Sequence, residues 1–404
     1  MLNHRTFIPV FILLSTLVGR FYIDLGFALK PYMVVTFILA PIILSNKIYK
    51  IKYHPQDLAF IIFFIFGGFS ALFSEDILNG TRLFILGFLW FVVYKFMSCF
   101  VSKIIISVND FIDIIYFTGF LFNFISIVLY LIGLYVMGVD FLSYNGLDVY
   151  GVTIDRGLPR LIGLAFDPNF FVMLNAPFFF FSLNMKRCQK QKLLFFMSAV
   201  TIFLSFSRGG WLAIILVVIV KYALNIFNIW NNKSYEKTSF QKQMIQFFVP
   251  SFFVAFMVFW NWEILIDILK KRFTNLTSGS GRSDLVNTML QLFSENPFFG
   301  VGFHNFRHYN LEKTGKFFYG HNTYLELLSE IGLIGFIFYF IYNVIFLIFT
   351  INIGKRNPDF KFIALSFMSI QLSSFFLTAL LNSALLFIMI LASITFIITE
   401  RMKN

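Results

Sequence analysis

Hydrophobic residues occupy most of the chain in long blocks, and short polar turns separate the blocks. A helix needs about 20 apolar residues to cross a lipid bilayer. The blocks that qualify are 6–24, 28–45, 57–74, 82–98, 111–137, 164–183, 192–207, 209–226, 245–262, 328–350, 360–377 and 379–398. Most are apolar all round, which is typical of membrane-spanning helices. The pattern predicts an all-α polytopic membrane protein with about twelve transmembrane helices, forming a single integral membrane domain over residues 1–404.

Composition and charge placement agree with this class. Of the residues, 58% are hydrophobic and only 13% are charged, which excludes a soluble globular chain. Lysines gather in alternate short loops, and cytoplasmic loops are the ones enriched in Lys and Arg. We therefore expect both termini in the cytoplasm. The net charge of +12 follows from this topology, so we expect no nucleic-acid partner. Aromatic runs such as 177–181 are expected to face lipid.

One polar stretch interrupts the apolar pattern, at residues 263–321 between the ninth and tenth predicted helices. The lysine pattern places this large loop on the extracytoplasmic side. Arginines stand out on that side, among them Arg160, and an arginine fork can grip phosphate through two parallel hydrogen bonds. The arginines either snorkel to lipid headgroups or bind an anionic ligand.

Arg208 lies between two apolar runs that have almost no loop between them, in Ser207-Arg208-Gly209-Gly210-Trp211. A guanidinium in or near hydrocarbon is costly and is by default a functional candidate. The alternative is an arginine that snorkels from a tight hairpin.

Two further candidates lie in the polar loop. Arg282 follows a Gly/Ser turn and precedes a short predicted helix, whose exposed N–H groups favour an anion; on local pattern alone it is also an ordinary solvated arginine. His321 opens the tenth span beside Asn322 and Glu326. A histidine can act as a base near neutral pH, and the alternative is an interfacial histidine.

Weaker patterns complete the list. Asp167 and Asn169 flank Pro168 at the start of the sixth span, where they either orient an arginine or a sugar or form a helix-start turn. Histidines of the loop allow a metal site to be drawn, but without a zinc-protease motif we expect no metal and no cofactor. Gly300-Val301-Gly302 lacks the third glycine of a nucleotide fingerprint and predicts a turn.

Four pieces of sequence together resemble the O-antigen ligase/O-antigen polymerase superfamily of bacterial envelope glycosyltransferases, over roughly residues 160–345. The pieces are, in order, Gly163-Leu164-Ala165-Phe166-Asp167-Pro168-Asn169; Ser207-Arg208-Gly209-Gly210-Trp211; Gly281-Arg282 followed by Asn296-Pro297-x-x-Gly300-x-Gly302; and His321-Asn322-x-Tyr324-Leu325. Each motif is short, and it is their order, spacing and topology together that make the resemblance specific.

The resemblance implies a GT-C-like enzyme at the outer face of the bacterial inner membrane. The implied donor is a glycan on undecaprenyl diphosphate, and the implied reaction is metal-independent and inverting. His321 would deprotonate the acceptor hydroxyl, and Arg208 and Arg282 would hold the diphosphate. Asp167, Asn169, Asn322, Glu326 and Arg160 would form a second tier of site residues.

Several functions stay open. A polymerase would join lipid-linked repeat units into O-antigen, capsule or exopolysaccharide, and it would work beside a flippase and a chain-length regulator. A ligase would transfer the finished glycan to lipid A-core. The Phe-, Ile-, Lys- and Asn-rich composition favours the polymerase by association with low-GC polysaccharide gene clusters. A lipid-linked oligosaccharide flippase is the alternative from another class, but we find no internal repeat typical of transporters. A non-catalytic assembly subunit is a further alternative.

Overall fold

The computed structural model describes residues 4–24, 28–46, 49–138, 148–155, 157–184, 189–231, 282–315 and 317–403. Most of these residues are helical. The helices are α1 (His4–Leu17), α2 (Pro31–Ser45), α3 (Pro55–Ala71), α4 (Ile77–Ile104), α5 (Val108–Met137), α6 (Pro168–Asn184), α7 (Gln189–Leu204), α8 (Arg208–Asn231), α11 (Arg282–Glu295), α12 (Phe306–Thr314), α13 (Thr323–Arg356), the 3-10 helix η3 (Pro358–Phe360), α14 (Lys361–Ser373) and α15 (Ser383–Arg401).

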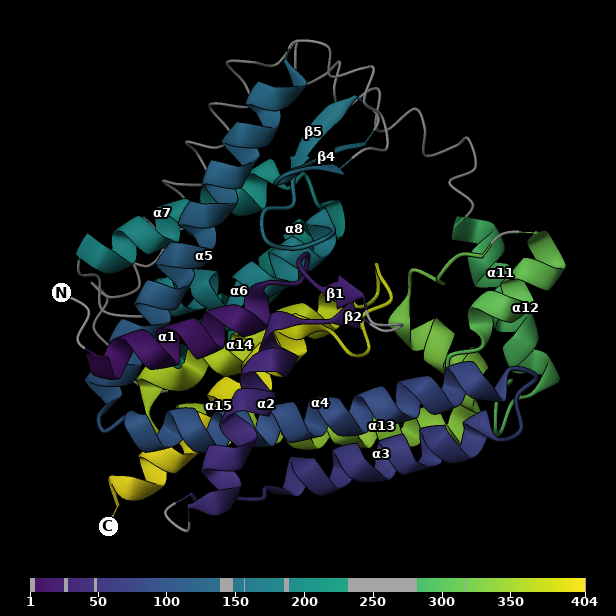
Figure 1. The fold of residues 1–404 in the computed structure, drawn as a ribbon, viewed down its shortest axis with the longest axis horizontal. Helices are drawn as coiled ribbons and strands as arrows, with labels where there is room; N and C mark the ends of the chain where they lie inside the picture. Colours follow the sequence, from purple (N-terminus) through teal and green to yellow (C-terminus); the bar gives the residue numbers. More distant parts are fainter. Residues whose placement is uncertain are drawn as a thin grey trace.

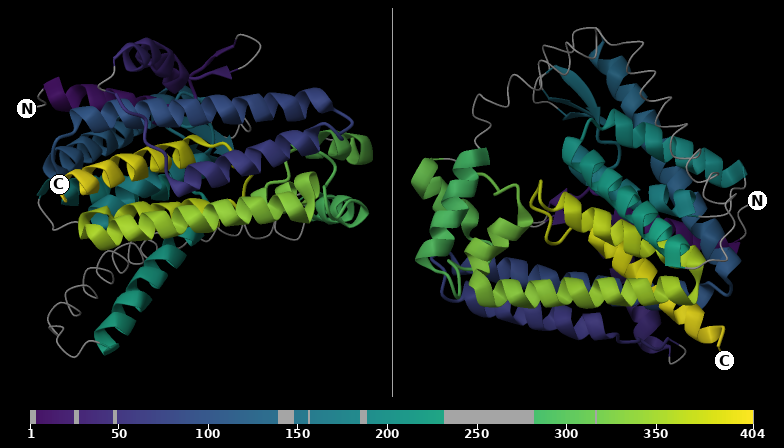
Figure 2. Two further views of the ribbon diagram at one scale, coloured as in Figure 1. Left: turned by 90° about the horizontal axis from the view of Figure 1, so that it is seen from below. Right: turned by 180° about the vertical axis from the view of Figure 1, so that it is seen from behind.

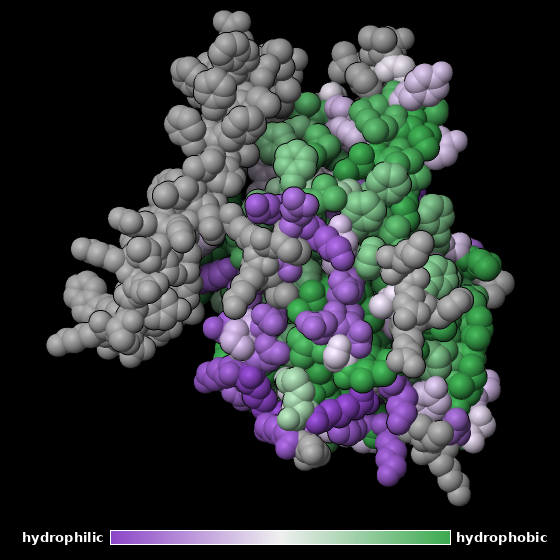
Figure 3. Space-filling model, turned by 90° about the vertical axis from the view of Figure 1, so that its left-hand side faces the viewer, coloured by the Kyte–Doolittle hydropathy of each residue, from purple (hydrophilic) through white to green (hydrophobic). Residues whose placement is uncertain are grey.

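The helices form a bundle with two different ends. Both termini lie at one end, and α11 and α12 lie at the other (Figure 1). Along the length of the bundle α3 packs against both α4 and α13 (Figure 2). Helix α15 lies inside, with residues 384–395 all buried. At the end with the termini, hydrophilic side chains gather on the surface (Figure 3), where Lys103, Lys355, Arg356 and Arg401 are exposed.

Four of the described helices are long and apolar enough to cross a membrane, namely α4, α5, α13 and α15. Shorter apolar helices occur at α1, α2 and α3. The prediction of a mainly helical, multi-pass membrane protein is therefore supported in outline. The number of twelve spans stays a prediction: run 245–262 lies outside the described residues, and each of the other predicted runs overlaps a helix.

The sequence pattern missed two small sheets. Strands β1 (Ile23–Asp24) and β2 (Ala28–Leu29) pair antiparallel, and β3 (Asp148–Val149), β4 (Val152–Asp155) and β5 (Leu158–Leu161) form a second antiparallel sheet. In β4 the buried side chains alternate with half-buried ones, as expected of a strand with one covered face. Strands β1 and β2 fall at the adjoining ends of the predicted runs 6–24 and 28–45, and strands this short give no alternating pattern of their own.

Helix boundaries also differ from the predicted runs, and two of these differences leave non-helical chain where a span was predicted. Run 6–24 is helical only to Leu17, because the chain then turns and the N–H groups of Gly19 and Arg20 both donate to the carbonyl of Leu164 at 3.1 Å. In runs 360–377 and 379–398 the two helices are α14 and α15, and residues 374–382 between them are not helical.

The expectation that residues 177–181 face lipid is wrong. The side chains of Phe178, Phe180 and Phe181 are 0% exposed. Phe178 packs against Phe387 of α15, and Phe181 packs edge-on against Phe362 of α14. Composition alone does not distinguish a buried helix face from a lipid-facing one, because both are apolar.

Helix α13 is broken at Gly332, whose φ of 64° and ψ of −171° are not helical. The break leaves backbone groups on both sides without their helical partners, and segment 296–302 supplies new ones. The hydrogen bonds run from Val301 N–H to Ser329 O (3.0 Å), Gly302 N–H to Glu330 O (2.8 Å), Leu333 N–H to Pro297 O (2.8 Å) and Ile334 N–H to Phe298 O (3.2 Å). Irregular backbone in a membrane helix is tolerated only where such partners exist. The Asn-Pro-x-x-Gly-x-Gly motif is thus the partner of the broken helix, and its glycines, at φ 70° and 105°, form the predicted turn.

Gly332→Ala is expected to destabilise the protein strongly. This φ/ψ region is open essentially to glycine alone, and an added Cβ would lie 2.4 Å from the carbonyl carbon of Phe298. Gly138→Ala is a matched control, since Gly138 has a similar φ of 65° and no atom of the described residues lies within 4 Å of its Cβ position. Thermal unfolding in detergent should give a larger loss of melting temperature for Gly332→Ala. Equal losses in the two variants would contradict the role of the close packing.

Candidate functional site

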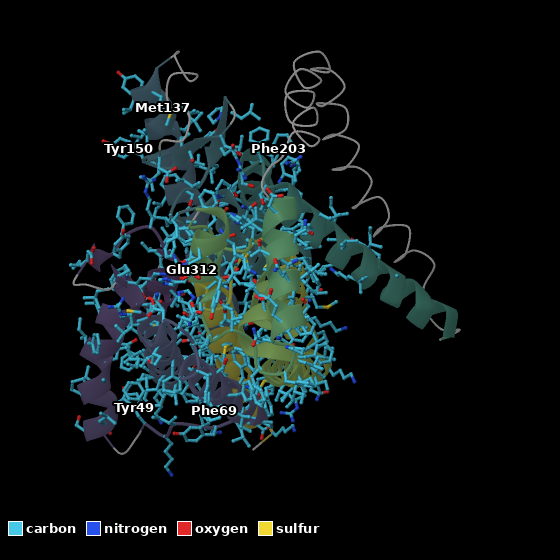
Figure 4. The ribbon with its side chains drawn as sticks, turned by 90° about the vertical axis from the view of Figure 1, so that its right-hand side faces the viewer. Tyr49, Phe69, Met137, Tyr150, Phe203 and Glu312 are labelled. Atoms are coloured by element: carbon cyan, nitrogen blue, oxygen red, sulfur yellow. The ribbon has the colours of Figure 1, made fainter. Side chains whose placement is uncertain are left out.

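A cavity of about 1480 Å³ lies between α11, α12 and the neighbouring ends of the bundle helices. Figure 4 looks onto this end of the molecule, with Glu312 of α12 near the centre and Tyr150 and Phe203 above it. The cavity brings together six of the residues proposed from the sequence. They are Arg160, Asp167, Asn169, Arg208, His321 and Glu326.

Arg208 is the first residue of α8 and follows a sharp turn from α7. The turn holds Phe206 at a φ of 48°. Ser207 stabilises the new helix, because its Oγ accepts from the N–H of Gly210 at 3.2 Å and donates to Oδ1 of Asn169 at 2.7 Å. The turn therefore fixes Arg208 at the cavity and ties it to the start of α6.

Asp167 and Arg160 lie on the same side of the cavity. Oδ1 of Asp167 accepts the N–H of Asn169 at 2.7 Å, so the helix-start turn anticipated from the sequence is present. Asp167 lines the cavity as well. Arg160, 9% exposed, donates to Asp155 at 3.0 Å and to the carbonyl of Ser205 at 3.1 Å. Its contacts join the β4–β5 hairpin to the α7–α8 turn.

His321 lines the same cavity from the turn before α13. Its φ is 53°, a left-handed conformation that is uncommon for a residue other than glycine. Strained backbone of this kind persists only where the surrounding contacts hold it, and it gathers at functional sites. Asn322 caps the N-terminus of α13, since its Oδ1 accepts hydrogen bonds from the N–H groups of Tyr324 and Leu325, both at 3.1 Å.

Glu326 is 3% exposed and holds the residue before His321. Its Oε2 accepts the N–H of Gly320 at 2.8 Å and the hydroxyl of Thr378. Glu330, one helical turn further, also lines the cavity, and its Oε1 accepts the N–H of Phe306 at 3.1 Å.

Arg282 begins α11, two residues before Asp284, which lines the cavity. The short helix predicted after Arg282 is therefore present and starts slightly earlier than the Gly/Ser turn indicated. The Arg282 side chain lies outside what the structure describes, so its place at the diphosphate stays a prediction.

Two basic residues of the cavity wall were not among the site residues proposed from the sequence. Lys30 is the N-cap residue of α2 and lines the cavity half-buried, where its positive charge is costly to hold. A bound anion would offset this cost. His304 has a φ of 61°, and burial, followed by the nearby Arg307 and His308, lowers its pKa to about 4. The sequence marked Lys30 only as a lone basic residue at a helix start, and His304 only as one of the loop histidines of a possible metal site.

Helix N-termini converge on the cavity. Lys30, Asp167, Arg208, Thr323 and Asn382 all line it and stand at the starts of α2, α6, α8, α13 and α15. The N-terminus of a helix carries a partial positive charge, which favours an anion. Together with Lys30 and Arg208 they make this cavity suited to a phosphate-bearing ligand.

Fold and cavity define a multi-pass helical membrane protein with a large, partly cationic site at one end. Residues 193–340 match the family model described as O-antigen ligase. The match includes Arg208, Arg282 and His321, and it supports the resemblance to the O-antigen ligase/O-antigen polymerase superfamily. A comparison with curated proteins finds no match. At this level the function is of the O-antigen ligase or polymerase type, which is a glycosyltransferase activity.

His304 is expected to make stability depend on pH. Its folded pKa of about 4 lies below the unfolded value of about 6.5, so between these values the unfolded chain binds more protons. The stabilisation is therefore complete above pH 6.5 and is lost as the pH falls towards 4. His304→Asn, which tolerates a positive φ, should lose less melting temperature than the wild type between pH 7 and pH 5. The same pH dependence in both proteins would contradict this assignment.

Proposed function

We propose that the protein polymerises undecaprenyl-diphosphate-linked oligosaccharide repeat units at the outer face of the bacterial inner membrane. The observation that carries the proposal is the meeting of Arg208 and His321 in one cavity, at the end of the bundle opposite the termini. The predicted topology puts this end outside the cytoplasm, where the donor is a lipid-linked glycan and not a nucleotide sugar.

The chemistry needs cations at one place and a base at another. A leaving diphosphate accumulates negative charge as its bond to the anomeric carbon breaks, and fixed cations and N–H groups stabilise that charge. In the proposal Arg208 and Arg282 bind the diphosphate, with Lys30 and the helix N-termini beside them. Asp167, Asn169 and Arg160 hold the Arg208 turn in place.

His321 acts as the general base in this mechanism. It accepts the proton of the acceptor hydroxyl as that oxygen attacks the anomeric carbon. The new glycosidic bond forms while the bond to the diphosphate oxygen breaks, and undecaprenyl diphosphate leaves with the electron pair. A single displacement of this kind inverts the anomeric configuration. It requires no metal where arginines already neutralise the diphosphate.

A ligase is the second candidate, because the matching family model carries that description. Both activities use the same donor and the same base, and they differ in the acceptor. The two are separated by supplying the purified protein with lipid-linked oligosaccharide extracted from a host strain that lacks this gene. Ladders of increasing length in the absence of lipid A-core support the polymerase. Transfer only after lipid A-core is added would overturn it in favour of the ligase, and no transfer to either acceptor would overturn both.

A further inference from the structure

Residues 374–382, between α14 and α15, form a wall of the cavity that lies outside the family match at 193–340. We call them the α14–α15 segment. In the sequence they belong to a nearly continuous apolar stretch, yet the chain leaves the helix after Ser373 and resumes it at Ser383. Every residue from Phe376 to Asn382 lines the cavity.

The α14–α15 segment contacts the His321 turn from two directions. On the side after His321, Thr323 donates its N–H to the carbonyl of Ser374 at 2.9 Å and its hydroxyl to the carbonyl of Leu377 at 2.7 Å. The N–H of Ala379 donates back to the Thr323 hydroxyl at 2.9 Å. These bonds fix the first turn of α13 to the segment.

On the side before His321, the contact runs through Glu326. The hydroxyl of Thr378 donates to Oε2 of Glu326, and the same oxygen accepts the N–H of Gly320 at 2.8 Å. Gly320 is the neighbour of His321 in the chain. The positive φ of His321 is therefore held between two sets of hydrogen bonds that both depend on the α14–α15 segment.

The segment also reaches the Arg208 side of the cavity. The ring of Phe376 lies directly against Gly209, where an added Cβ would be 2.7 Å from its Cγ atom. Only a glycine lets the start of α8 come this close to the ring. One short stretch of chain therefore touches both the residue after Arg208 and the turn that carries His321.

We propose that the α14–α15 segment sets the position of His321 relative to Arg208, with Thr378 and Phe376 as its positioning residues. This inference rests on the proposed function, because it assigns these two residues to alignment of the base and the diphosphate site. A displacement of about 1 Å in such a geometry can lower a rate by on the order of 100-fold.

The first test removes one hydroxyl. Thr378→Val keeps the shape and loses the bond to Glu326, so we expect kcat for elongation of the extracted lipid-linked oligosaccharide to fall about 10- to 100-fold. The KM for the donor should stay within about twofold of the wild-type value, because the substitution leaves the Arg208 side of the cavity unchanged. A change in KM alone would indicate lost binding of the donor, which this variant should retain. Thr378→Ser, which restores the hydroxyl, should recover most of the lost kcat.

Thr395→Val is the matched control. Thr395 is also a threonine and is buried where Thr378 is half-buried, and within the described residues its hydroxyl bonds to the carbonyls of Leu391 and Ala392 in α15. It should keep the kcat of the wild type. A wild-type kcat in Thr378→Val would overturn the inference, and so would a loss that Thr378→Ser does not recover. A wild type that elongates nothing would overturn the proposed function itself, which is a distinct result.

The second test uses the contact between Gly209 and Phe376. Gly209→Ala should lower kcat because the new methyl group pushes α8 and the segment apart. Phe376→Leu in the same chain removes the ring edge and should restore part of the rate. A double variant no more active than Gly209→Ala, with both proteins monodisperse and of equal melting temperature, would contradict the positioning role of Phe376.

Discussion

Replacement of His321 by asparagine is expected to lower the rate of glycan transfer by roughly 100- to 10,000-fold, the usual contribution of a general base. Asparagine is the useful substitute because it tolerates the positive φ of 53° at this position, so the backbone turn survives. His321→Ala should be at least as inactive, with an added loss of stability from the same φ. The measurement is elongation of the extracted lipid-linked oligosaccharide by purified protein of unchanged melting temperature.

The control for His321 is another histidine of the same polar loop. His308 pairs with Asp76 at 3.0 Å, contacts Asn79 and does not line the cavity. His308→Asn should therefore keep most of the transfer rate. Full activity of His321→Asn would remove His321 from the mechanism, whatever the effect on His308.

Replacement of Arg208 by alanine is expected to weaken binding of undecaprenyl diphosphate by about 10- to 100-fold, because hydrogen bonds to a charged group contribute about 1.5–3 kcal/mol each. Arg208→Lys should bind better than the alanine variant and worse than the wild type, since lysine keeps the charge but loses the planar fork. Direct titration with undecaprenyl diphosphate in detergent, at two salt concentrations, measures the effect. The affinity of Arg208→Ala should depend less on salt than that of the wild type, because the variant has lost one positive charge.

Arg356→Lys is the matched control for Arg208→Lys. Arg356 pairs with Glu400 at 2.6 Å at the end of the bundle that holds the termini. Its replacement should leave the affinity unchanged. Equal affinity of the wild type and Arg208→Ala would place the diphosphate elsewhere in the cavity.

The candidate residues of the cavity could be selected from residue types and their neighbours. A histidine at a helix mouth and an arginine between two apolar runs are costly in a membrane chain, which made His321 and Arg208 visible. Lys30 was not recognised as a candidate site residue, because nothing in the local sequence distinguishes it from other lysines at helix starts. Its value as a site residue appears only when α2 is packed against the rest of the cavity wall.

The α14–α15 segment shows the same limit for the fold. Residues 360–398 are almost all apolar, and nothing local forces the helix to stop after Ser373. The hydrogen bonds that end it come from Thr323 and Glu326, which are distant in sequence. Likewise, the sequence predicts a turn at 300–302 and an unbroken span at 328–350. Only the packing shows that the span breaks at Gly332 and that segment 296–302 completes its hydrogen bonding.

By itself, then, the sequence indicated a helical membrane chain, predicted a long polar loop, showed the family resemblance and named the leading candidates for base and diphosphate ligand. Hydrophobicity and residue chemistry are local properties, and they can be read without a partner. The tertiary structure decided where the helices break, which helix starts face the cavity and that Arg208, Lys30 and His321 share it. Those outcomes depend on hydrogen bonds and close packing between segments far apart in the chain, and no local pattern encodes them.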